Sequence, residues 1–122
     1  MGKRILVVDD EPDIIEQLRI RLNASGYDVI SAENGVNALK QAKEGSPDLI
    51  ILDVMMPPPN GFQVARELKD SVEYSRIPII MVTAKSTESD QFWGMESGAD
   101  AYLTKPYNSA ELMGKIKSLL GE

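Results

Sequence analysis

The sequence predicts an α/β fold in which five strands and five helices alternate along one chain. Apolar runs of strand length recur, and stretches with the apolar spacing of a helix lie between them. Three of the runs are continuous and rich in Val and Ile, which is typical of strands buried on both faces of a parallel sheet. The length of 122 residues suits one domain, which we place at 1–122.

Each expected strand is followed by an expected helix. In chain order the units are 5–8 with 12–24, 29–30 with 36–43, 49–52 with 62–71, 79–82 with 87–97, and 101–103 with a last helix whose apolar face holds Leu112, Met113, Ile116, Leu119 and Leu120. The first helix has the clearest signals, because Leu18 and Leu22 share one face. Pro12 suits its first turn, and Gly26 lies just past its end.

Strict alternation implies a parallel sheet with helices on both faces, joined by right-handed crossovers. We therefore predict a flavodoxin-like, doubly wound (βα)5 fold, in which a five-stranded sheet of order 2-1-3-4-5 is the middle layer of a three-layer sandwich. Open sheets of this kind bind ligands beyond the carboxyl ends of their strands. Functional residues are therefore expected at that edge.

Residues of complementary chemistry follow the expected strand ends. Asp9 and Asp10 follow the first strand, and Asp53 follows the third. Thr83 ends the fourth strand, and Lys105 follows the fifth. The predicted strand order brings these carboxylates, the hydroxyl and the ammonium into one crevice.

Clustered carboxylates repel one another, so this cluster needs a cation. The chain has no histidine and no cysteine, and oxygen ligands alone favour a hard ion. We expect Mg²⁺, with Mn²⁺ as the alternative. Phosphoryl transfer depends mainly on positioning and charge stabilisation. In this interpretation Asp53 is the nucleophile, and Thr83 and Lys105 hold phosphoryl oxygens.

Each residue also has a simpler explanation on its own. Asp9 and Asp10 could cap the first helix. Asp53 and Thr83 could be ordinary strand-end residues, and Lys105 could be a solvated surface lysine. Together these explanations account poorly for complementary groups at every strand end on one side.

Two other functional classes use a similar fold. An aspartate phosphohydrolase of the haloacid dehalogenase type carries its nucleophile in an Asp-x-Asp run after the first strand, where this chain has residues 9–12 (DDEP). A flavodoxin-like cofactor binder needs a loop of hydroxyls and glycines around a phosphate, and none follows the first strand. Turnover of a phosphate monoester, or a coloured purified protein, would favour one of these classes.

Four motifs occur in register along the chain. They are 5–11 (ILVVDDE), 52–57 (LDVMMP) with Gly61 following, 82–84 (VTA) and 98–106 (GADAYLTKP). Through these motifs the chain resembles a response-regulator receiver domain of two-component signalling over essentially its whole length.

This resemblance implies a role for each site residue. Asp53 is the phosphoacceptor, Asp10 binds Mg²⁺ directly, and Asp9 binds it mostly through water. The backbone carbonyl of Met55 supplies a further ligand. Lys105 is the phosphate-binding lysine, and the peptide bond that follows it is expected to be cis.

The resemblance also implies a switch. Thr83 is the switch hydroxyl and Tyr102 the switch aromatic, and their movement alters the face made by the fourth helix, fifth strand and fifth helix. The implied partners are a sensor histidine kinase or a histidine phosphotransfer protein upstream and a protein target on that face downstream. The protein is then a signalling switch that catalyses only its own phosphorylation and dephosphorylation.

Trp93 is expected to be partly exposed on this switching face. The spacing of Phe92 and Met95 places those two side chains on the buried face of the fourth helix. Tryptophan is enriched at binding hot spots, so Trp93 either anchors a protein partner or packs on a neighbouring side chain.

Some positions depart from the family pattern. Residues 58–60 (PPN) make the loop after the third strand stiffer and less charged. Ala101 stands where the winged-helix transcription factors of the family carry an acid, so we expect a monomer or a weak dimer rather than their symmetric dimer. Met55 and Lys85 occupy positions where the family tunes the rate of phosphate loss.

Composition excludes several functions. The net charge of −6 disfavours direct contact with nucleic acid. The longest apolar runs are strand-sized, so neither a membrane span nor a signal peptide is expected, and the lack of cysteine fits the cytoplasm. Because the chain has no histidine, any phosphohistidine must come from another protein.

Overall fold

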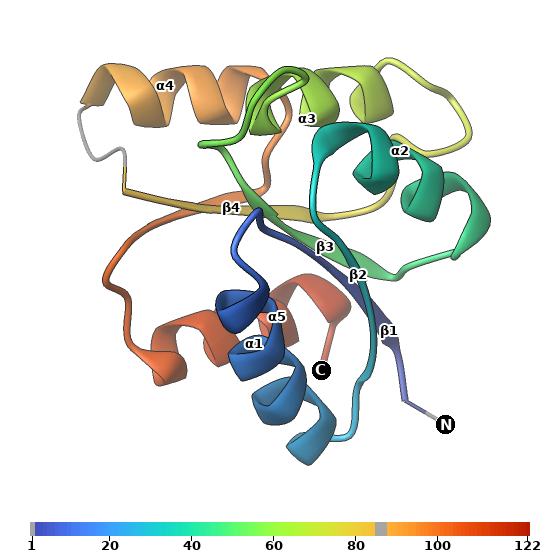
Figure 1. Cartoon of the computed structure of the whole chain (residues 1–122), viewed down its shortest axis with the longest axis vertical. Coiled ribbons are helices and arrows are strands. Elements are labelled where there is room, and N and C mark those ends of the chain that lie inside the picture. The colour runs from blue at the N-terminus through green and yellow to red at the C-terminus, as the bar shows by residue number, and fades with distance from the viewer. Residues whose placement is uncertain (1, 85–87) are drawn as a thin grey trace.

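The computed structural model describes residues 2–84 and 88–122, in which strands and helices alternate (Figure 1). The strands are β1 (Arg4–Val8), β2 (Asp28–Ala32), β3 (Leu49–Asp53), β4 (Ile79–Thr83) and β5 (Ala101–Thr104), and the helices are α1 (Pro12–Ala24), α2 (Gly35–Glu44), α3 (Gly61–Lys69), α4 (Glu88–Glu96) and α5 (Ser109–Leu120). Every strand and helix expected from the sequence is present. No helix in the described ranges is long and apolar enough to cross a bilayer.

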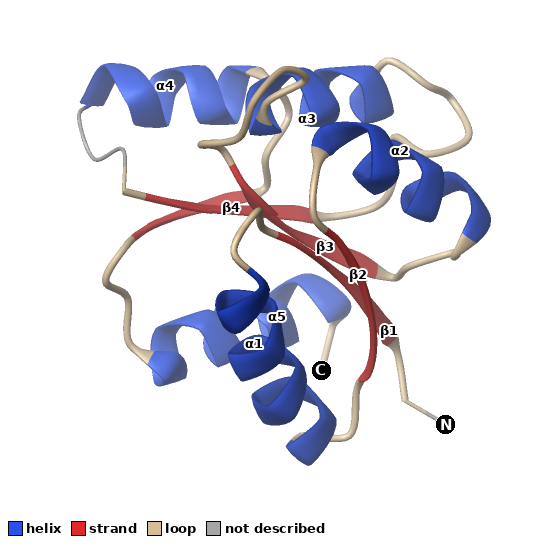
Figure 2. Ribbon diagram, viewed as in Figure 1, coloured by secondary structure: helices blue, strands red, loops and turns tan. Residues whose placement is uncertain are grey.

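The five strands form one parallel sheet in the order β2-β1-β3-β4-β5. Helices α1 and α5 cover one face, and α2, α3 and α4 cover the other (Figure 2). The predicted fold class, a flavodoxin-like doubly wound three-layer sandwich, is therefore confirmed.

The core lies in two layers, one on each face of the sheet. Leu6 and Ile50 belong to the cluster under α2, α3 and α4, whereas Ile5 and Ile51 belong to the cluster under α1 and α5. Because successive side chains of a strand point to opposite faces, a central strand needs apolar residues at every position. This requirement explains the continuous apolar runs of the sequence.

Asparagine side chains cap three of the helices. Asn34, Asn60 and Asn108 each accept a hydrogen bond from the backbone N–H three residues later, at the starts of α2, α3 and α5. At α3 the Gln63 side chain also accepts from the Asn60 N–H, which completes a capping box. These two hydrogen bonds hold Asn60, the last residue of the loop between β3 and α3, against the first turn of α3.

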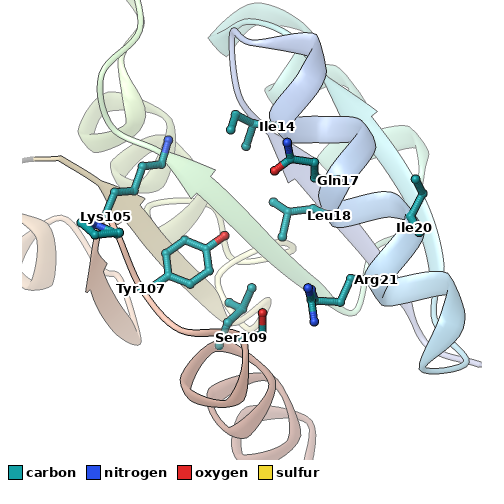
Figure 3. A pocket seen from close by; sticks show the side chains of 10 residues that line it. Ile14, Gln17, Leu18, Ile20, Arg21, Lys105, Tyr107 and Ser109 are labelled. Carbon is teal, nitrogen blue, oxygen red and sulfur yellow. The ribbon is translucent and has the colours of Figure 1, made fainter.

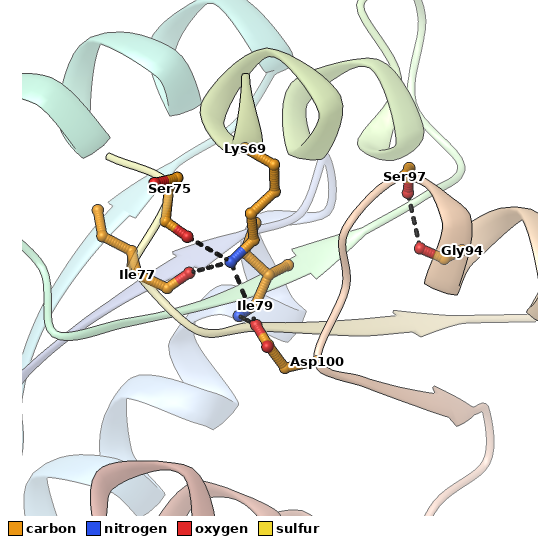
Figure 4. A network of polar contacts seen from close by, with 7 residues as sticks. All are labelled: Lys69, Ser75, Ile77, Ile79, Gly94, Ser97 and Asp100. Carbon is orange, nitrogen blue, oxygen red and sulfur yellow. Dashed lines mark hydrogen bonds and ion pairs between the residues drawn. The ribbon is translucent and has the colours of Figure 1, made fainter. Parts of the chain in front are cut away.

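A lysine joins the loops at the amino end of β4 (Figure 4). Lys69 Nζ donates to the carbonyls of Ser75 (3.0 Å) and Ile77 (2.8 Å) and lies 3.4 Å from Asp100 Oδ2. The same carboxylate oxygen accepts from the Ile79 N–H at 2.8 Å. This cluster ties the end of α3 to the turn that leads into β5.

The prediction that Phe92 and Met95 lie on the buried face of α4 is wrong. Phe92 and Met95 are 56% and 49% exposed, whereas Gly94 and Ser97 are buried. The reason is that Tyr102 of β5 lies directly against Gly94, so the sheet-facing position of α4 has no room for a large side chain. The apolar spacing of α4 therefore marks exposed residues.

Candidate functional site

The five residues predicted at the strand ends lie at the carboxyl edge of the sheet. Asp9 and Asp10 follow β1, and Asp53 is the last residue of β3. Thr83 is the last residue of β4, and Lys105 follows β5. The neighbouring order of these strands brings together groups that are far apart in sequence.

Three carboxylates form the centre of the site. Asp9, Asp10 and Asp53 each offer an oxygen within 4.8 Å of the other two. Asp9 and Asp53 are 3% and 6% exposed, while Asp10 is exposed to solvent. Oxygens bound to one octahedral Mg²⁺ lie about 3 Å apart at adjacent positions and about 4 Å apart at opposite positions, so these carboxylates would move closer together around an ion. The donor set fits a hard divalent ion.

A half-buried lysine lies beside two of these carboxylates. Lys105 Nζ lies 3.3 Å from Asp9 Oδ2 and 3.8 Å from Asp53 Oδ2. The peptide bond between Lys105 and Pro106 is cis, as expected. The ammonium compensates part of the negative charge of the carboxylate cluster.

Backbone N–H groups orient two of the carboxylates. The Glu11 N–H donates to Asp9 Oδ1 at 2.9 Å, and the Met55 N–H donates to Asp53 Oδ1 at 3.0 Å. Asp9 therefore bonds the residue two positions later in an Asx turn, as short acidic side chains often do. The N-cap of α1 is Glu11, without a side-chain hydrogen bond, so the simpler capping explanation for Asp9 and Asp10 is not supported.

Burial and neighbouring charges shift the pKa values of Asp53 and Lys105. Burial raises the pKa of the Asp53 carboxyl, and the other two carboxylates of the cluster raise it further. The Met55 N–H and the Lys105 ammonium act against this rise in pKa. Burial lowers the pKa of Lys105, but the carboxylates of Asp53 and Asp9 outweigh it, so the Lys105 pKa is raised and the ammonium stays charged. An additional cation would lower the pKa of Asp53 and keep it ionised.

Gly61 supports Asp53 from behind, a role that sequence reasoning missed. A Cβ at position 61 would lie 2.5 Å from the Asp53 carbonyl oxygen and 2.6 Å from the Val54 Cα. The Gly61 N–H also donates to the Val54 carbonyl at 3.2 Å. The glycine in the second motif was the available signal, but only the packing explains why a larger residue would displace Asp53.

A sequence model of the response regulator receiver domain matches residues 5–117. The chain belongs to this receiver family. Receiver domains are signalling switches rather than classical enzymes, and the predicted family is confirmed.

Two similar proteins differ in how much of their own length this chain covers. The alkaline phosphatase synthesis transcriptional regulatory protein PhoP of Bacillus subtilis (strain 168) is 47% identical over 98% of this chain and 49% of its own length. Protein PilH of Pseudomonas aeruginosa is 42% identical over 96% of this chain and 97% of its own length. The chain thus spans about half of PhoP and nearly all of PilH.

A solved receiver structure bears on the metal. The receiver domain of the sensor histidine kinase PA1611 from Pseudomonas aeruginosa PAO1 aligns over 100% of both chains, with a TM-score of 0.90 and 30% identity. That structure holds a magnesium ion coordinated in its active site cleft. In the present chain, Asp9, Asp10 and Asp53 form an acidic cluster that could hold a metal ion.

The expected switch residues of this receiver domain lie on β5, which is an edge strand of the sheet, and on the neighbouring strand β4. Thr83 is fully buried, and Tyr102 is half-buried against the core cluster under α2, α3 and α4. Met55 has a half-exposed side chain, and its carbonyl remains a predicted ligand. Lys85 lies outside the described residues.

A pocket of about 710 Å³ opens between α1 and α5 beside Lys105 (Figure 3). Tyr107, which sequence reasoning did not single out, lines it together with Leu18 and Arg21. Burial raises the pKa of the Tyr107 hydroxyl. No motif marked Tyr107, because its place beside the site depends on how α5 packs against α1.

Trp93 is 57% exposed, as expected, and lines a groove of about 390 Å³ with Phe62, Gln63, Arg66 and Ser97. Its ring meets Phe92 edge to face, with centroids 5.6 Å apart. The groove lies between α3 and α4, whereas Tyr102 contacts α4 at Gly94. Trp93 therefore lies on the side of α4 next to α3, whereas Tyr102 packs against α4 at Gly94.

Proposed function

We propose that this receiver domain, over residues 1–122, takes a phosphoryl group onto Asp53. The donor is the phosphohistidine of a sensor histidine kinase or a histidine phosphotransfer protein, or acetyl phosphate. The observation that carries this proposal is the convergence of three carboxylates and Lys105 at one edge of the sheet. An acidic cluster beside a fixed ammonium suits the binding and stabilisation of a phosphoryl group.

The metal in this proposal is Mg²⁺, with Mn²⁺ as the alternative. Asp9, Asp10 and Asp53, with the backbone carbonyl of Met55, would hold it. When bound, the ion would neutralise charge on the carboxylates and on the phosphoryl oxygens. The short mutual distances of the three carboxylates support this assignment.

In the transfer step, a carboxylate oxygen of Asp53 attacks phosphorus, and the bond from phosphorus to the donor nitrogen or oxygen breaks. Lys105 and the Thr83 hydroxyl hold the phosphoryl oxygens as the charge moves. Water later attacks phosphorus, which releases phosphate and restores the Asp53 carboxylate. The catalysis is confined to this cycle of the protein's own phosphorylation.

The output follows from a two-state equilibrium. Phosphorylation would favour the state in which Thr83 moves toward the phosphoryl group and Tyr102 turns inward. The changed surface would be the one formed by α4, β5 and α5, which would bind a downstream protein, with Trp93 beside it. The net charge of −6 supports a protein partner over nucleic acid.

Substitution of the acceptor tests the proposal. Asp53→Asn should abolish covalent labelling by acetyl phosphate in the presence of Mg²⁺, because an amide oxygen is a poor nucleophile. The measurement is intact-mass spectrometry or mobility on a phosphate-binding gel. Asp28→Asn, which removes an exposed carboxylate at the start of β2, is the matched control and should label normally. Wild-type labelling of Asp53→Asn would refute the proposed acceptor.

A further inference from the structure

A glycine in α4 lies against the ring of Tyr102. A Cβ at position 94 would lie 2.5 Å from Cδ2 and 2.6 Å from Cε2 of that ring, and 3.4 Å from Met81 Sδ. Contacts under 3 Å between carbon atoms are repulsive, so the ring occupies space that any other residue in this position would fill. Tyr102 is half-buried because of this contact and its packing against the core.

The position of Gly94 is fixed by its own hydrogen bonds. Its carbonyl accepts from the Ser97 hydroxyl at 2.7 Å (Figure 4) and from the Ala99 N–H at 3.3 Å. These bonds join the last turn of α4 to the turn that enters β5. A collision at position 94 is therefore relieved more easily by moving the Tyr102 ring than by moving the end of the helix.

The ring is also in line with the switch threonine. Tyr102 is paired with Met81, and two residues further Thr104 is paired with Thr83. Side chains two residues apart in a strand point to the same face, so Tyr102 and Thr83 lie on the face covered by α4. The ring of Tyr102 therefore contacts α4 on the same face of the sheet as the Thr83 side chain.

We propose that Gly94 is a positioning residue of the switch: it provides the space for the inward Tyr102 ring and so couples phosphorylation at Asp53 to α4. The coupling rests on the proposed function of Asp53. The contact between Gly94 and Tyr102 does not, because it depends only on how β5 packs against α4. Gly94 therefore acts through Tyr102 and touches no reacting atom.

The test is a double-mutant cycle with Gly94→Ala, Tyr102→Ala and the combined variant. Gly114→Ala is the matched control, because Gly114 is also inside a helix and nothing lies within 4 Å of its added Cβ. The probe is beryllium fluoride with Mg²⁺, an analogue of the acyl phosphate. Trp93, the one tryptophan of the chain and the neighbour of Gly94, reports binding by its fluorescence.

Gly94→Ala should weaken the apparent affinity for beryllium fluoride by about fivefold or more, because the inward ring is disfavoured. Gly114→Ala should leave this affinity unchanged. In the Tyr102→Ala background, Gly94→Ala should have no further effect. The proposal would be overturned if Gly94→Ala bound beryllium fluoride with wild-type affinity. It would also be overturned if Gly94→Ala lowered this affinity equally in the Tyr102→Ala background.

Denaturant unfolding without the probe separates the two proposals. Alanine favours a helix over glycine, so Gly114→Ala should raise the unfolding midpoint. Gly94→Ala should lower it when Tyr102 is present and raise it when Tyr102 is alanine. If the effects of Gly94→Ala and Tyr102→Ala on the unfolding midpoint were additive, the proposed role of the contact between Gly94 and the Tyr102 ring would be contradicted. If the variants show this non-additive effect on unfolding but the wild-type protein does not bind beryllium fluoride, the phosphorylation proposal is refuted instead.

Discussion

At the scale of single residues, the geometry of Asp53 depends on glycine as much as on charge. Its Oδ1 is held by the Met55 N–H and its Oδ2 faces Lys105, so the carboxylate is oriented from two sides. Its backbone is in contact with Gly61, where an added Cβ would meet the Asp53 carbonyl. The position of the proposed acceptor thus depends on a residue that has no reactive side chain.

Gly61→Ala should slow labelling of Asp53 by acetyl phosphate by about tenfold or more. The new methyl group forces the backbone of Asp53 or α3 to move, and displacements below 1 Å already cost large factors in rate. The initial rate of labelling at fixed Mg²⁺ measures the effect. Gly114→Ala, which meets open space, should label at the wild-type rate. A wild-type rate for Gly61→Ala would show that this contact does not position the acceptor.

At the scale of elements, the two ends of β4 have separate roles. Its carboxyl end supplies Thr83 to the site, whereas its amino end is held by Lys69 and Asp100. The Lys69 ammonium satisfies two loop carbonyls and partly compensates the Asp100 carboxylate. This cluster fixes the loops around β4 at the amino edge of the sheet, opposite the edge that carries the acidic site.

Lys69→Met should lower the free energy of unfolding by about 1–3 kcal/mol, because two partly buried carbonyls lose a charged donor while the apolar stem is kept. Chemical denaturation measures the loss. Lys115→Met, at an exposed position of α5, should change stability by about 0.5 kcal/mol or less. Labelling of Asp53 should persist in both variants. Equal stability of the two variants would contradict a structural role for the Lys69 cluster.

At the scale of the whole molecule, the ionisation of Asp53 links the stability of the fold to pH and to cation binding. The folded pKa of Asp53 is raised, so its contribution to stability is present at low pH and is lost as the pH rises through that raised pKa. A cation that binds the folded carboxylates reverses this loss. The contribution of Asp53 to the stability of the metal-free protein and its contribution to metal affinity therefore depend on pH in opposite directions.

Mg²⁺ should stabilise the protein at pH 7 by about 2.7 kcal/mol at one hundred times its dissociation constant. The stabilisation should shrink as the pH falls below the raised pKa of Asp53, because the protonated carboxyl binds Mg²⁺ poorly. Thermal unfolding with and without Mg²⁺ at several pH values measures it. Asp53→Asn should show a smaller Mg²⁺ effect at pH 7. A Mg²⁺ effect of equal size at acid and neutral pH would contradict the assignment.

Much of the site could be predicted because strand order follows from a simple pattern. The alternation of apolar runs and helices determined the parallel sheet, and the residues after each run determined which groups meet at its carboxyl edge. Asp53 and Lys105 are 52 positions apart, yet their meeting required only that β3, β4 and β5 be neighbours in register.

The sequence by itself thus determined the fold and the acidic site, because both depend on backbone periodicity. Tertiary structure alone decided the contacts in which side chains compete for space. The burial of Gly94 instead of Phe92 and Met95, the position of Trp93 on the side of α4 next to α3 and the placing of Tyr107 between α1 and α5 depend on volumes from distant elements. Such volumes leave no periodic signal in the chain, since a position is filled or left empty according to what packs against it.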